Sequence, residues 1–407
     1  MASRMKVAVV HDYLAQAGGA ERVAATLHSL FPAASLFTSV YDAKATLAYF
    51  QDIPITTSFL QRWPLSSQCM HKLALPLYPT AFEHFDFRGC DLVLSSSSSF
   101  AKGVITPPET CHVCYCHTPA RFAWRQREYL SQSRRGRLMS LLLGGVLGRL
   151  RSWDIESAQR PDYYVANSYN VAQRIRKYYR RDVAAVIPPP IETEHYSPIS
   201  PREVGNHFLV VSRLVGYKRI DLAVEACNRL QVPLRVVGTG PDMAGLKRLA
   251  GPTITFSGRL TDQEVADEYA RCRALIVPGE EDFGMTPLEC MASGRPVVAF
   301  AAGGALETVI DGQTGLLFQS QTADSLAAAL MTVSNTEFAP EVLQRYAARF
   351  GVSVFKDRMT RFLEGAWDQH QARLRNSFGI GPFSSSGAPA FCADGEDLFN
   401  PFLRGSK

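Results

Sequence analysis

The sequence contains no run of about 18 uncharged apolar residues, so it predicts no membrane-spanning helix. Its longest apolar stretch, 138–148, has eleven residues and includes Ser140 and three glycines. A secretion signal is lacking as well, because Arg4 and Lys6 precede an apolar run of only four residues, which ends at His11. We therefore expect a cytoplasmic protein.

The sequence contains only one Cys-x-x-Cys pair, whereas a zinc ribbon needs a second pair at a defined spacing. The chain has nine cysteines, an odd number, and without a secretion signal we expect them to be reduced. Cys111 and Cys114 form a Cys-x-x-Cys pair beside His112, which raises the possibility of a metal site. The segment is typical of a strand, however, and a strand directs neighbouring ligands to opposite faces. The better interpretation is buried thiols without a metal.

The chain has no strong excess of one charge. Its net charge is +5 and its pI is about 8.7, which does not indicate a nucleic-acid-binding protein. The charge is uneven, because residues 121–180 hold 13 Lys/Arg and 4 Asp/Glu. The apolar stretch 138–148 lies between arginines, and Trp153 follows (the arginines are Arg134, Arg135, Arg137, Arg149 and Arg151). Two interpretations of 134–153 stay open: peripheral contact with an anionic inner membrane, or an ordinary helix with solvated arginines.

No G-x-G-x-x-G fingerprint with a downstream acidic residue occurs, which argues against a dinucleotide oxidoreductase. A Walker loop and an Asp-x-Asp metal motif are absent as well. Short apolar runs alternate instead with helical patterns. The predicted strands are 5–10, 91–94, 110–116 and 163–166, then 208–211, 234–237, 254–256, 274–277 and 297–299. The predicted helices include 20–30, 220–230, 241–249, 262–271 and 286–293. This rhythm predicts an α/β protein with two doubly wound parallel sheets.

A proline-rich stretch at 187–206 interrupts both patterns and marks the boundary. We expect a first domain at 1–195 and a second at 196–353. A helix at 354–375 follows, and the Gly/Ser/Pro-rich tail 376–407 is expected to be disordered. Ligands of open sheets bind at the carboxyl ends of the strands, so a cleft between the two domains is the expected site.

Two polar segments follow predicted strands of the first half. Gly18 and Gly19 lie between a strand and a helix, where backbone N–H groups can approach a phosphate or sugar closely. A plain tight turn explains these glycines equally well. His117 follows the strand 110–116 directly, and its role is catalytic or structural.

Two further polar segments follow predicted strands of the second half of the chain. Arg213 and Lys218 flank a turn before a helix, where two cations suit a diphosphate, although a solvated basic turn is the alternative. Glu281 and Glu289 are eight residues apart, with Gly284 between them. Carboxylates accept hydrogen bonds from the vicinal hydroxyls of a sugar or ribose, and backbone N–H groups at 284–286 would face a phosphate. An acidic first helical turn is the alternative.

Together these motifs resemble glycosyltransferase family 4, the retaining enzymes of the GT-B fold. The Glu281…Glu289 spacing is similar to that family's E-x7-E motif, Arg213…Lys218 to its Arg/Lys pair, and Gly18-Gly19 to its glycine loop. The runs 303–307 and 311–315 are also similar. The likeness covers about residues 5–370. Segments 114–119 and 217–221 are most similar to a bacterial subgroup of O-antigen and exopolysaccharide mannosyltransferases.

The resemblance implies the GT-B fold, with two Rossmann-like domains facing across a cleft and the helix 354–375 crossing back to the first domain. It also implies roles for specific residues. His117, Arg213, Lys218 and Glu281 would be catalytic. The donor would be bound by Gly18, Gly19, Gly258, Arg259, Leu260, Phe283, Gly284, Met285, Thr286 and Glu289. Of these, 258–260 would border the base and Glu289 would hold the ribose. The acceptor would lie near His11, Asp12 and Tyr13. No cofactor and no metal would be needed.

The resemblance further implies transfer of a sugar, mannose from GDP-mannose, to a lipid-linked saccharide in cell-surface polysaccharide or glycolipid biosynthesis. The nucleotide sugar and the lipid-linked acceptor would be the partners. One alternative is a family 4 enzyme that uses a UDP-sugar. Another is a non-catalytic nucleotide-sugar-binding scaffold, although a scaffold need not keep both cations and both carboxylates.

Overall fold

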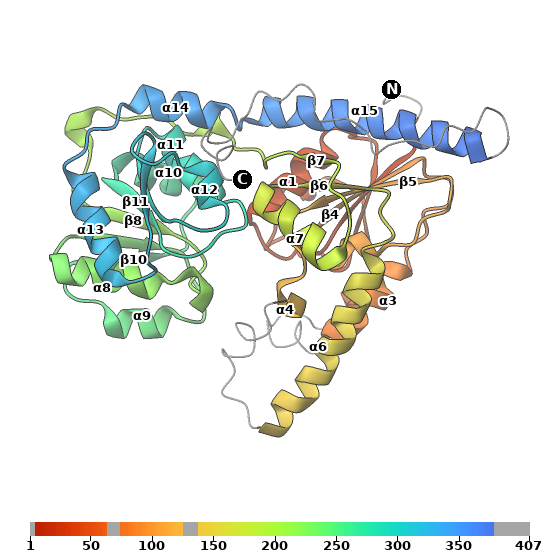
Figure 1. The fold of residues 1–407 in the computed structure, drawn as a ribbon, viewed down its shortest axis with the longest axis horizontal. Helices are drawn as coiled ribbons and strands as arrows, with labels where there is room; N and C mark the ends of the chain where they lie inside the picture. The colour runs from red at the N-terminus through yellow and green to blue at the C-terminus, as the bar shows by residue number, and fades with distance from the viewer. Residues whose placement is uncertain (1–4, 63–73, 125–136, 378–407) are drawn as a thin grey trace. The chain divides into compact units, whose positions relative to one another are not determined.

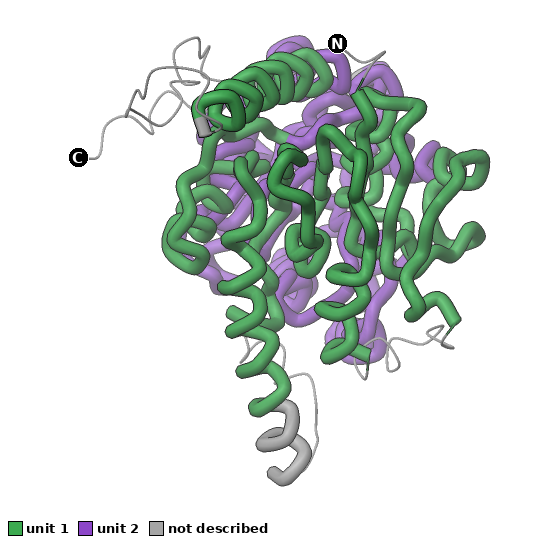
Figure 2. Tube along the Cα trace, turned by 90° about the vertical axis from the view of Figure 1, so that its right-hand side faces the viewer, with its two compact units in different colours: residues 1–188, 355–394 green, residues 189–354, 395–407 purple. Residues whose placement is uncertain are grey.

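The computed structural model describes residues 5–62, 74–124 and 137–377, which form two compact units (Figure 2). Unit 1 runs to Pro188 and resumes at Phe355, and unit 2 comprises Pro189–Val354. The change of unit at Pro188 lies in the proline-rich stretch. The last helix extends to Ser377, two residues into the predicted tail, and 378–407 lie outside the described residues.

Unit 1 is built on a seven-stranded parallel sheet in the order β3-β2-β1-β4-β5-β6-β7 (Figure 1). Its strands are β1 Val7–His11, β2 Ser35–Thr38, β3 Ile55–Thr57, β4 Leu92–Ser97, β5 Cys111–Cys116, β6 Tyr163–Ala166 and β7 Ala185–Val186. β1 pairs with both β2 and β4, so the strand order reverses between β1 and β4. In sheets of this kind such a reversal opens a crevice at the carboxyl ends of the strands.

Helices cover both faces of this sheet. They are α1 Gly19–His28, α3 Tyr78–Glu83, α4 Arg121–Trp124, α6 Arg137–Ser157, α7 Tyr169–Tyr179 and α15 Val352–Ser377, with the short 3-10 turns η1 Ala48–Phe50, η2 Phe59–Arg62, η3 Leu75–Leu77 and η4 Ala101–Gly103. α7 begins where the Ser168 hydroxyl accepts a hydrogen bond from the amide of Val171 at 3.0 Å. In the described part of the chain, no helix combines the length and apolar character needed to cross a bilayer.

The last helix, α15, packs onto unit 1 through residues spaced three or four apart. Phe355, Met359, Phe362 and Ala366 are buried in one cluster with apolar side chains of β5 and β6. Such spacing presents one helix face to the sheet. α15 therefore completes the core of unit 1, although β5 and β6 both precede it in the chain by more than the whole length of unit 2.

Unit 2 has a six-stranded parallel sheet in the order β10-β9-β8-β11-β12-β13. Its strands are β8 Phe208–Val211, β9 Leu234–Val237, β10 Ile254–Gly258, β11 Ala274–Val277, β12 Val297–Phe300 and β13 Gly315–Phe318. Its helices are α8 Ile220–Leu230, α9 Met243–Leu249, α10 Asp262–Arg271, α11 Met285–Ala292, α12 Ala305–Thr308, α13 Ala323–Ser334 and α14 Pro340–Ala348, with the turns η5 Thr193–His195, η6 Pro201–Glu203 and η7 Gly216–Lys218. Two doubly wound parallel sheets are thus present, as predicted.

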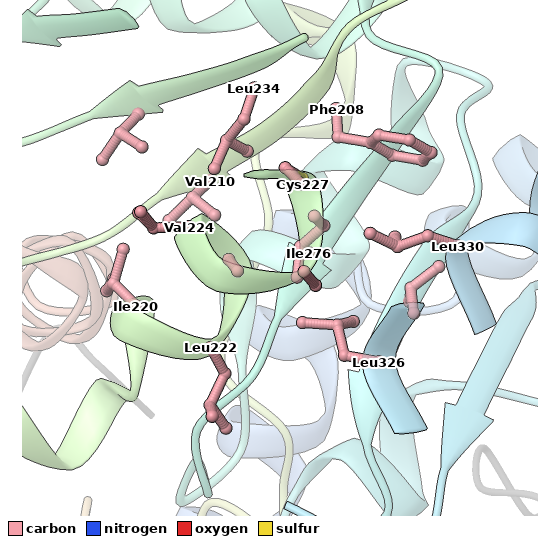
Figure 3. Packing of buried hydrophobic residues seen from close by; sticks show 14 of the residues in the cluster. Phe208, Val210, Ile220, Leu222, Val224, Cys227, Leu234, Ile276, Leu326 and Leu330 are labelled. Carbon is pink, nitrogen blue, oxygen red and sulfur yellow. The ribbon is translucent and has the colours of Figure 1, made fainter. Parts of the chain in front are cut away.

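The core of unit 2 lies between this sheet and the helices α8 and α13. Val224 and Cys227 of α8 meet Leu326 and Leu330 of α13 beside Ile276 of β11 (Figure 3). All five side chains are almost completely buried. This packing fixes β8 and β11, the two central strands, whose carboxyl ends carry the predicted Arg213/Lys218 and Glu281 segments.

Candidate active site

In unit 2 the structure brings Lys218 and Glu281 together at the carboxyl edge of the sheet. Lys218 ends η7, which follows β8, and Glu281 lies in the loop after the neighbouring strand β11. The Lys218 ammonium donates a hydrogen bond to Glu281 Oε1, and the two side chains are only 15% and 16% exposed. The pair is thus largely shielded from solvent, where charges interact more strongly.

A glycine allows these two loops to meet. A Cβ atom at Gly279 would lie 2.7 Å from the Cα of Lys218 and 2.8 Å from its carbonyl oxygen. Any other residue would push the η7 turn away from the loop after β11. The close approach therefore depends on Gly279, which lies two residues before Glu281 and has the smallest possible side chain.

A small cavity lies beside the ion pair. Lys218, Glu281, Thr286 and Ser212 supply its polar groups, and apolar residues from the ends of β8 and β11 form its floor. It is located where the strand order of unit 2 reverses, between β8 and β11. This is the position where ligands of doubly wound sheets bind.

The N-terminus of α11 adds hydrogen-bond donors next to this cavity. Gly284 precedes the helix with φ +92° and, as a glycine, provides no side chain of its own to cap the first turn. Thr286 is in that first turn and lines the cavity. Backbone N–H groups at a helix N-terminus favour negatively charged oxygen atoms. Phe283, by contrast, is buried and its ring packs against Phe350, so it anchors the loop.

Glu289 lies one turn further into α11, where Tyr269 of α10 holds it. The Tyr269 hydroxyl donates a hydrogen bond to Glu289 Oε2 at 2.8 Å. Burial and the neighbouring carboxylate raise the pKa of Tyr269 well above its usual value, so the phenol stays protonated and remains a donor. Nothing in the sequence pattern distinguished Tyr269 from an ordinary helix core residue.

The other predicted donor-binding residues of unit 2 occupy different places. Arg213 follows β8 and donates to the Tyr217 hydroxyl at 3.3 Å, and the Tyr217 ring lies 5.3 Å from the Lys218 ammonium. Tyr217 thus links the two predicted cations, although Arg213 does not line the small cavity. Gly258 ends β10 with φ +69°, Arg259 is exposed and Leu260 is partly buried. That segment lies two strands away from β8 in the sheet.

In unit 1 a chain of hydrogen bonds connects His11 and His117 through Ser96. His11 Nδ1 lies 3.1 Å from both the carbonyl oxygen and the hydroxyl of Ser96, and that hydroxyl lies 2.8 Å from His117 Nε2. Because a carbonyl oxygen only accepts, Nδ1 of His11 carries a proton. β1, β4 and β5 are adjacent strands, and all three residues lie at or just beyond their carboxyl ends. Sequence reasoning missed Ser96, which lies in the serine run 95–99 and is not distinguished from its neighbours by the pattern.

Gly18 and Gly19 lead into α1, and the carboxylate of Glu21 fills the space beside them. A Cβ atom at Gly18 would lie 2.8 Å from Glu21 Oε2. Burial opposes ionisation of Glu21, but hydrogen bonds and charge from His11 and Gln16 outweigh it and hold the pKa of Glu21 below its usual value. A negative charge therefore already lies at this helix N-terminus, which favours a hydroxyl ligand there over a phosphate.

Asp12 and Tyr13, the remaining predicted acceptor residues, differ in their surroundings. The buried Asp12 carboxylate accepts hydrogen bonds from the amides of Ser98, Phe100 and Ala101 and from the Ser98 hydroxyl, at 2.6–2.9 Å. Four donors satisfy this carboxylate, so Asp12 holds the turn before η4 in place. Tyr13 is partly buried at the end of β1.

The arginine-rich segment is described only from 137 onward, and its later residues pack into unit 1. The Trp153 indole donates to Glu83 at 2.8 Å, and its ring packs near Phe100 and Lys102. Arg151 donates to the carbonyl of Ala123 at 2.8 Å, whereas Arg149 is exposed. Trp153 is therefore a packing residue of unit 1 and not a free interfacial anchor. Arg134, Arg135 and the side chain of Arg137 lie outside the described residues.

A comparison with models of known protein families finds a match within unit 2. Residues 205–336 match the family model of glycosyl transferases group 1. Unit 2 contains a group 1 glycosyltransferase domain. This domain carries Lys218, Glu281, Glu289 and the N-terminus of α11, so the candidate site lies within the matched region.

Two curated relatives are similar to about half of this chain. D-inositol 3-phosphate glycosyltransferase of Nocardiopsis dassonvillei is 30% identical over 213 residues, which are 45% of this chain and 49% of that protein. O-antigen chain mannosyltransferase C of Escherichia coli is 29% identical over 212 residues, 48% of this chain and 54% of that protein. The chain spans about half the length of the curated relatives it matches.

Solved structures extend the likeness to both units. Anabaena HepE, in a complex with UDP and glucose, matches with a TM-score of 0.66 at 20% identity, over 89% of this chain and all of that one. Sucrose-phosphate synthase from Thermosynechococcus elongatus matches with a TM-score of 0.61 at 18% identity, over 93% of this chain and all of the other. The chain has the GT-B fold, as the sequence motifs implied.

Proposed function

We propose that this chain is a retaining glycosyltransferase that moves mannose from GDP-mannose onto a lipid-linked saccharide in cell-surface polysaccharide or glycolipid biosynthesis. The observation that carries the proposal is the shielded Lys218–Glu281 pair, beside a polar cavity and the N-terminus of α11. A cation and backbone N–H groups suit the diphosphate of a nucleotide sugar, and a carboxylate suits its sugar hydroxyls.

In the proposed reaction the acceptor hydroxyl is the nucleophile. The bond between C1 of the donor sugar and the diphosphate oxygen breaks, and a bond from the acceptor oxygen to C1 forms on the same face. The acceptor proton passes to the leaving phosphate oxygen, so no carboxylate base is required. Arg213 and Lys218 stabilise the negative charge that develops on the diphosphate. Glu281 orients the donor sugar and Glu289, held by Tyr269, binds the ribose, while His117 would contact the sugar from unit 1.

Two donors remain candidates for the site. Similarity to O-antigen chain mannosyltransferase C and to a mycobacterial GDP-mannose-dependent mannosyltransferase supports GDP-mannose. The fold is also similar to that of HepE bound to UDP-glucose, which supports a UDP-sugar as the alternative. Competition between GDP and UDP for the purified protein distinguishes the two. Tighter binding of UDP would replace the mannosyl assignment.

The central experiment measures transfer from a panel of nucleotide sugars to a polyprenyl-linked saccharide. We expect turnover with GDP-mannose, and a loss of about 100-fold or more in Glu281→Ala, because one preorganised electrostatic contact is commonly worth that much. Glu341→Ala is the matched control, since Glu341 is an exposed carboxylate on α14. No turnover with any donor, or full turnover in Glu281→Ala, would refute the proposal.

A non-catalytic scaffold would give a different pattern. It would bind the nucleotide sugar, and binding would weaken in Glu281→Ala, but no donor would be consumed. Hydrolysis or transfer of the sugar excludes this possibility. The catalytic interpretation is supported by the presence of both cations, Arg213 and Lys218, and both carboxylates, Glu281 and Glu289. A scaffold need not keep all four.

We also propose peripheral attachment to the inner face of the cytoplasmic membrane through 134–153, where a lipid-linked acceptor would be available. The excess of arginines at 121–180 supports this, since each cation adds about 1 kcal/mol near an anionic leaflet. Flotation with anionic liposomes tests it, with neutral liposomes as the control. Unchanged flotation after Arg134, Arg135 and Arg137 are replaced by Ser would contradict it.

A further inference from the structure

Three side chains of the types that bind metals converge in unit 1, where Cys111 and Asp162 lie at the amino ends of β5 and β6. Cys111 begins β5, Asp162 directly precedes β6, and His370 lies on α15. The thiol sulfur, a carboxylate oxygen and a ring nitrogen all lie within 4.8 Å of one another. A search of the described residues for three or more His, Cys, Asp or Glu side chains that could share one metal ion finds this group.

The fold explains why these positions meet. Cys111 shares one face of β5 with Val113 and Tyr115, and this face is covered by α15. His370 follows Ala366 by four residues and therefore continues the helix face that packs on the sheet. Figure 1 shows α15 running along the sheet of unit 1. Cys114 belongs to the cluster on the other side of the sheet, so the Cys-x-x-Cys pair itself does not converge.

Hydrogen bonds orient two of the three ligands. His370 Nε2 lies 3.2 Å from the carbonyl oxygen of Glu109, and because a carbonyl only accepts, Nε2 carries a proton. In the neutral ring Nδ1 then has a lone pair, which lies 3.9 Å from Asp162 Oδ2. The amide of His112 donates to the same Oδ2 at 2.8 Å. A metal-ligating histidine commonly donates its other N–H to a backbone carbonyl in this way.

The three side chains therefore bring a ring nitrogen of His370, a carboxylate oxygen of Asp162 and the sulfur of Cys111 within 4.8 Å of one another. We propose that Cys111, Asp162 and His370 form a binding site for a divalent transition-metal ion, with zinc as the best fit. Sulfur, imidazole and carboxylate together suit zinc, whereas magnesium and calcium prefer oxygen ligands.

Binding of the ion requires loss of one proton. The Cys111 thiol is buried and its pKa is raised, so the thiol releases its proton only as the sulfur–metal bond forms. A fourth position remains for water on the side of Asp162, whose side chain is the most exposed of the three at 32%. The ion would join β5, the start of β6 and α15, and would hold the last helix on unit 1.

Cobalt(II) is a suitable probe, because it binds zinc sites and reports its ligands optically. The full-length protein, purified and treated with a chelator, is titrated with Co²⁺. We expect one equivalent to bind, with a sulfur-to-cobalt charge-transfer band in the near ultraviolet, and zinc to displace it. Zinc should also raise the midpoint of thermal unfolding of the metal-free protein.

Variants make the assignment specific. Cys111→Ser should abolish the charge-transfer band, and His370→Gln should weaken cobalt binding by about tenfold or more. Cys114→Ser is the matched control, since it removes a buried thiol from the other face of the same strand, and it should keep both band and affinity. Circular dichroism shows that each variant is folded.

Two results would overturn the proposal. One is the absence of a thiolate band in the wild-type protein, which would mean that no ion binds through Cys111. The other is an unchanged band in Cys111→Ser with His370→Gln also unchanged, which would place the metal elsewhere. Neither result bears on sugar transfer, so the proposed function is tested separately.

Discussion

His112 is a buried histidine whose ionisation should make the stability of the protein depend on pH. Burial, with the charges of Arg160 and Arg181, lowers the pKa of His112 to about 3. In the unfolded chain a histidine has a pKa near about 6.5, so below that pH the unfolded state binds one more proton. Stability is therefore expected to fall as pH decreases from about 6.5, by up to about 1.4 kcal/mol per pH unit.

Urea unfolding between about pH 7 and about pH 5 measures this effect. His112→Gln should flatten the profile in that range, because the variant has no proton to gain. Part of the slope should remain, since burial also lowers the pKa of His28. His84→Gln is the control, because His84 is exposed, and it should retain the wild-type slope. A full slope in His112→Gln would contradict the assignment.

Lys102 and Asp154 form a buried ion pair, which predicts a large effect of a single substitution. The two side chains are each 1% exposed, and their atoms lie 2.6 Å apart. Asp154 also accepts hydrogen bonds from Trp124 and Tyr179. Lys102→Met would leave this carboxylate buried without a cation, so we expect a loss of about 3–5 kcal/mol in the free energy of unfolding.

An exposed pair provides the comparison. Arg88 and Asp86 lie 2.6 Å apart, but their side chains are 85% and 56% exposed. Water and salt screen such a pair, so Arg88→Met should change the denaturation midpoint little. Equal losses in Lys102→Met and Arg88→Met would show that burial does not set the strength of these interactions.

Sequence spacing selected candidate site residues in two pairs, Arg213 with Lys218 and Glu281 with Glu289. Each pair follows a predicted strand, but the spacing did not predict that Lys218 and Glu281 meet. The structure places them in direct contact. Tyr269 and Ser96 escaped prediction, because their roles depend on contacts with residues 20 or more positions away. No local pattern encodes such contacts.

The loop that carries Glu281 is held in position by a close backbone contact between Gly304 and Phe283. A Cβ atom at Gly304 would lie 2.1 Å from the carbonyl oxygen of Phe283, while the Gly304 amide donates to the carbonyl of Glu281 at 2.9 Å. Gly304→Ala should therefore displace this loop. We expect a loss of about 1–3 kcal/mol in the free energy of unfolding and weaker nucleotide binding.

The control for this prediction is another glycine of unit 2. Gly245 lies inside α9, and its nearest atom to a new Cβ would be the end of Arg248 at 3.9 Å. Gly245→Ala should stabilise the protein by about 0.5–1 kcal/mol, because alanine favours the helix. Unfolding midpoints and nucleotide titrations of both variants test the pair. A neutral Gly304→Ala would mean that the loop adjusts without cost.

Regular elements with a clear period were predicted closely. The strands at 163–166, 208–211, 234–237 and 274–277 and the helices at 220–230 and 262–271 agree with the structure residue for residue. The peripheral strands β2, β3, β7 and β13 were missed, since they have two to four residues and a mixed or partial burial of their side chains. A short strand with mixed burial has neither an apolar run nor a period, and only its pairing partner defines it.

Across the whole chain, the two cores should respond separately to substitution. Met359 of α15 is completely buried in unit 1. Met359→Ala should cost about 2–5 kcal/mol, because it leaves a cavity between α15 and the sheet. Hydrogen exchange should then show lower protection in β4 and β5 and unchanged protection in β8 and β11. Met331→Ala, at a position that is 58% exposed on α13, is the control. Equal loss of protection in both units would show that they unfold together.

Domain-level organisation was accessible from sequence because the β-α rhythm begins again after the proline-rich stretch. The length of the last helix was less accessible. Its pattern indicated about 354–375, whereas α15 spans Val352–Ser377. Polar residues at both ends have no period to mark them, and helix ends are set by local capping and packing. The family resemblance implied that this helix returns to the first domain, and its described residues from Phe355 onward belong to unit 1.

The placement of α15 has a consequence for the synthesis of the protein. The strands of unit 1 leave the ribosome first, but the helix that covers Val113 and Tyr115 is translated only after all of unit 2. Unit 2 is one continuous segment and can fold as soon as it emerges, as domains commonly do during translation. Unit 1 cannot bury this face until residues beyond Phe355 are available. The domain that is translated first is therefore the one that is completed last.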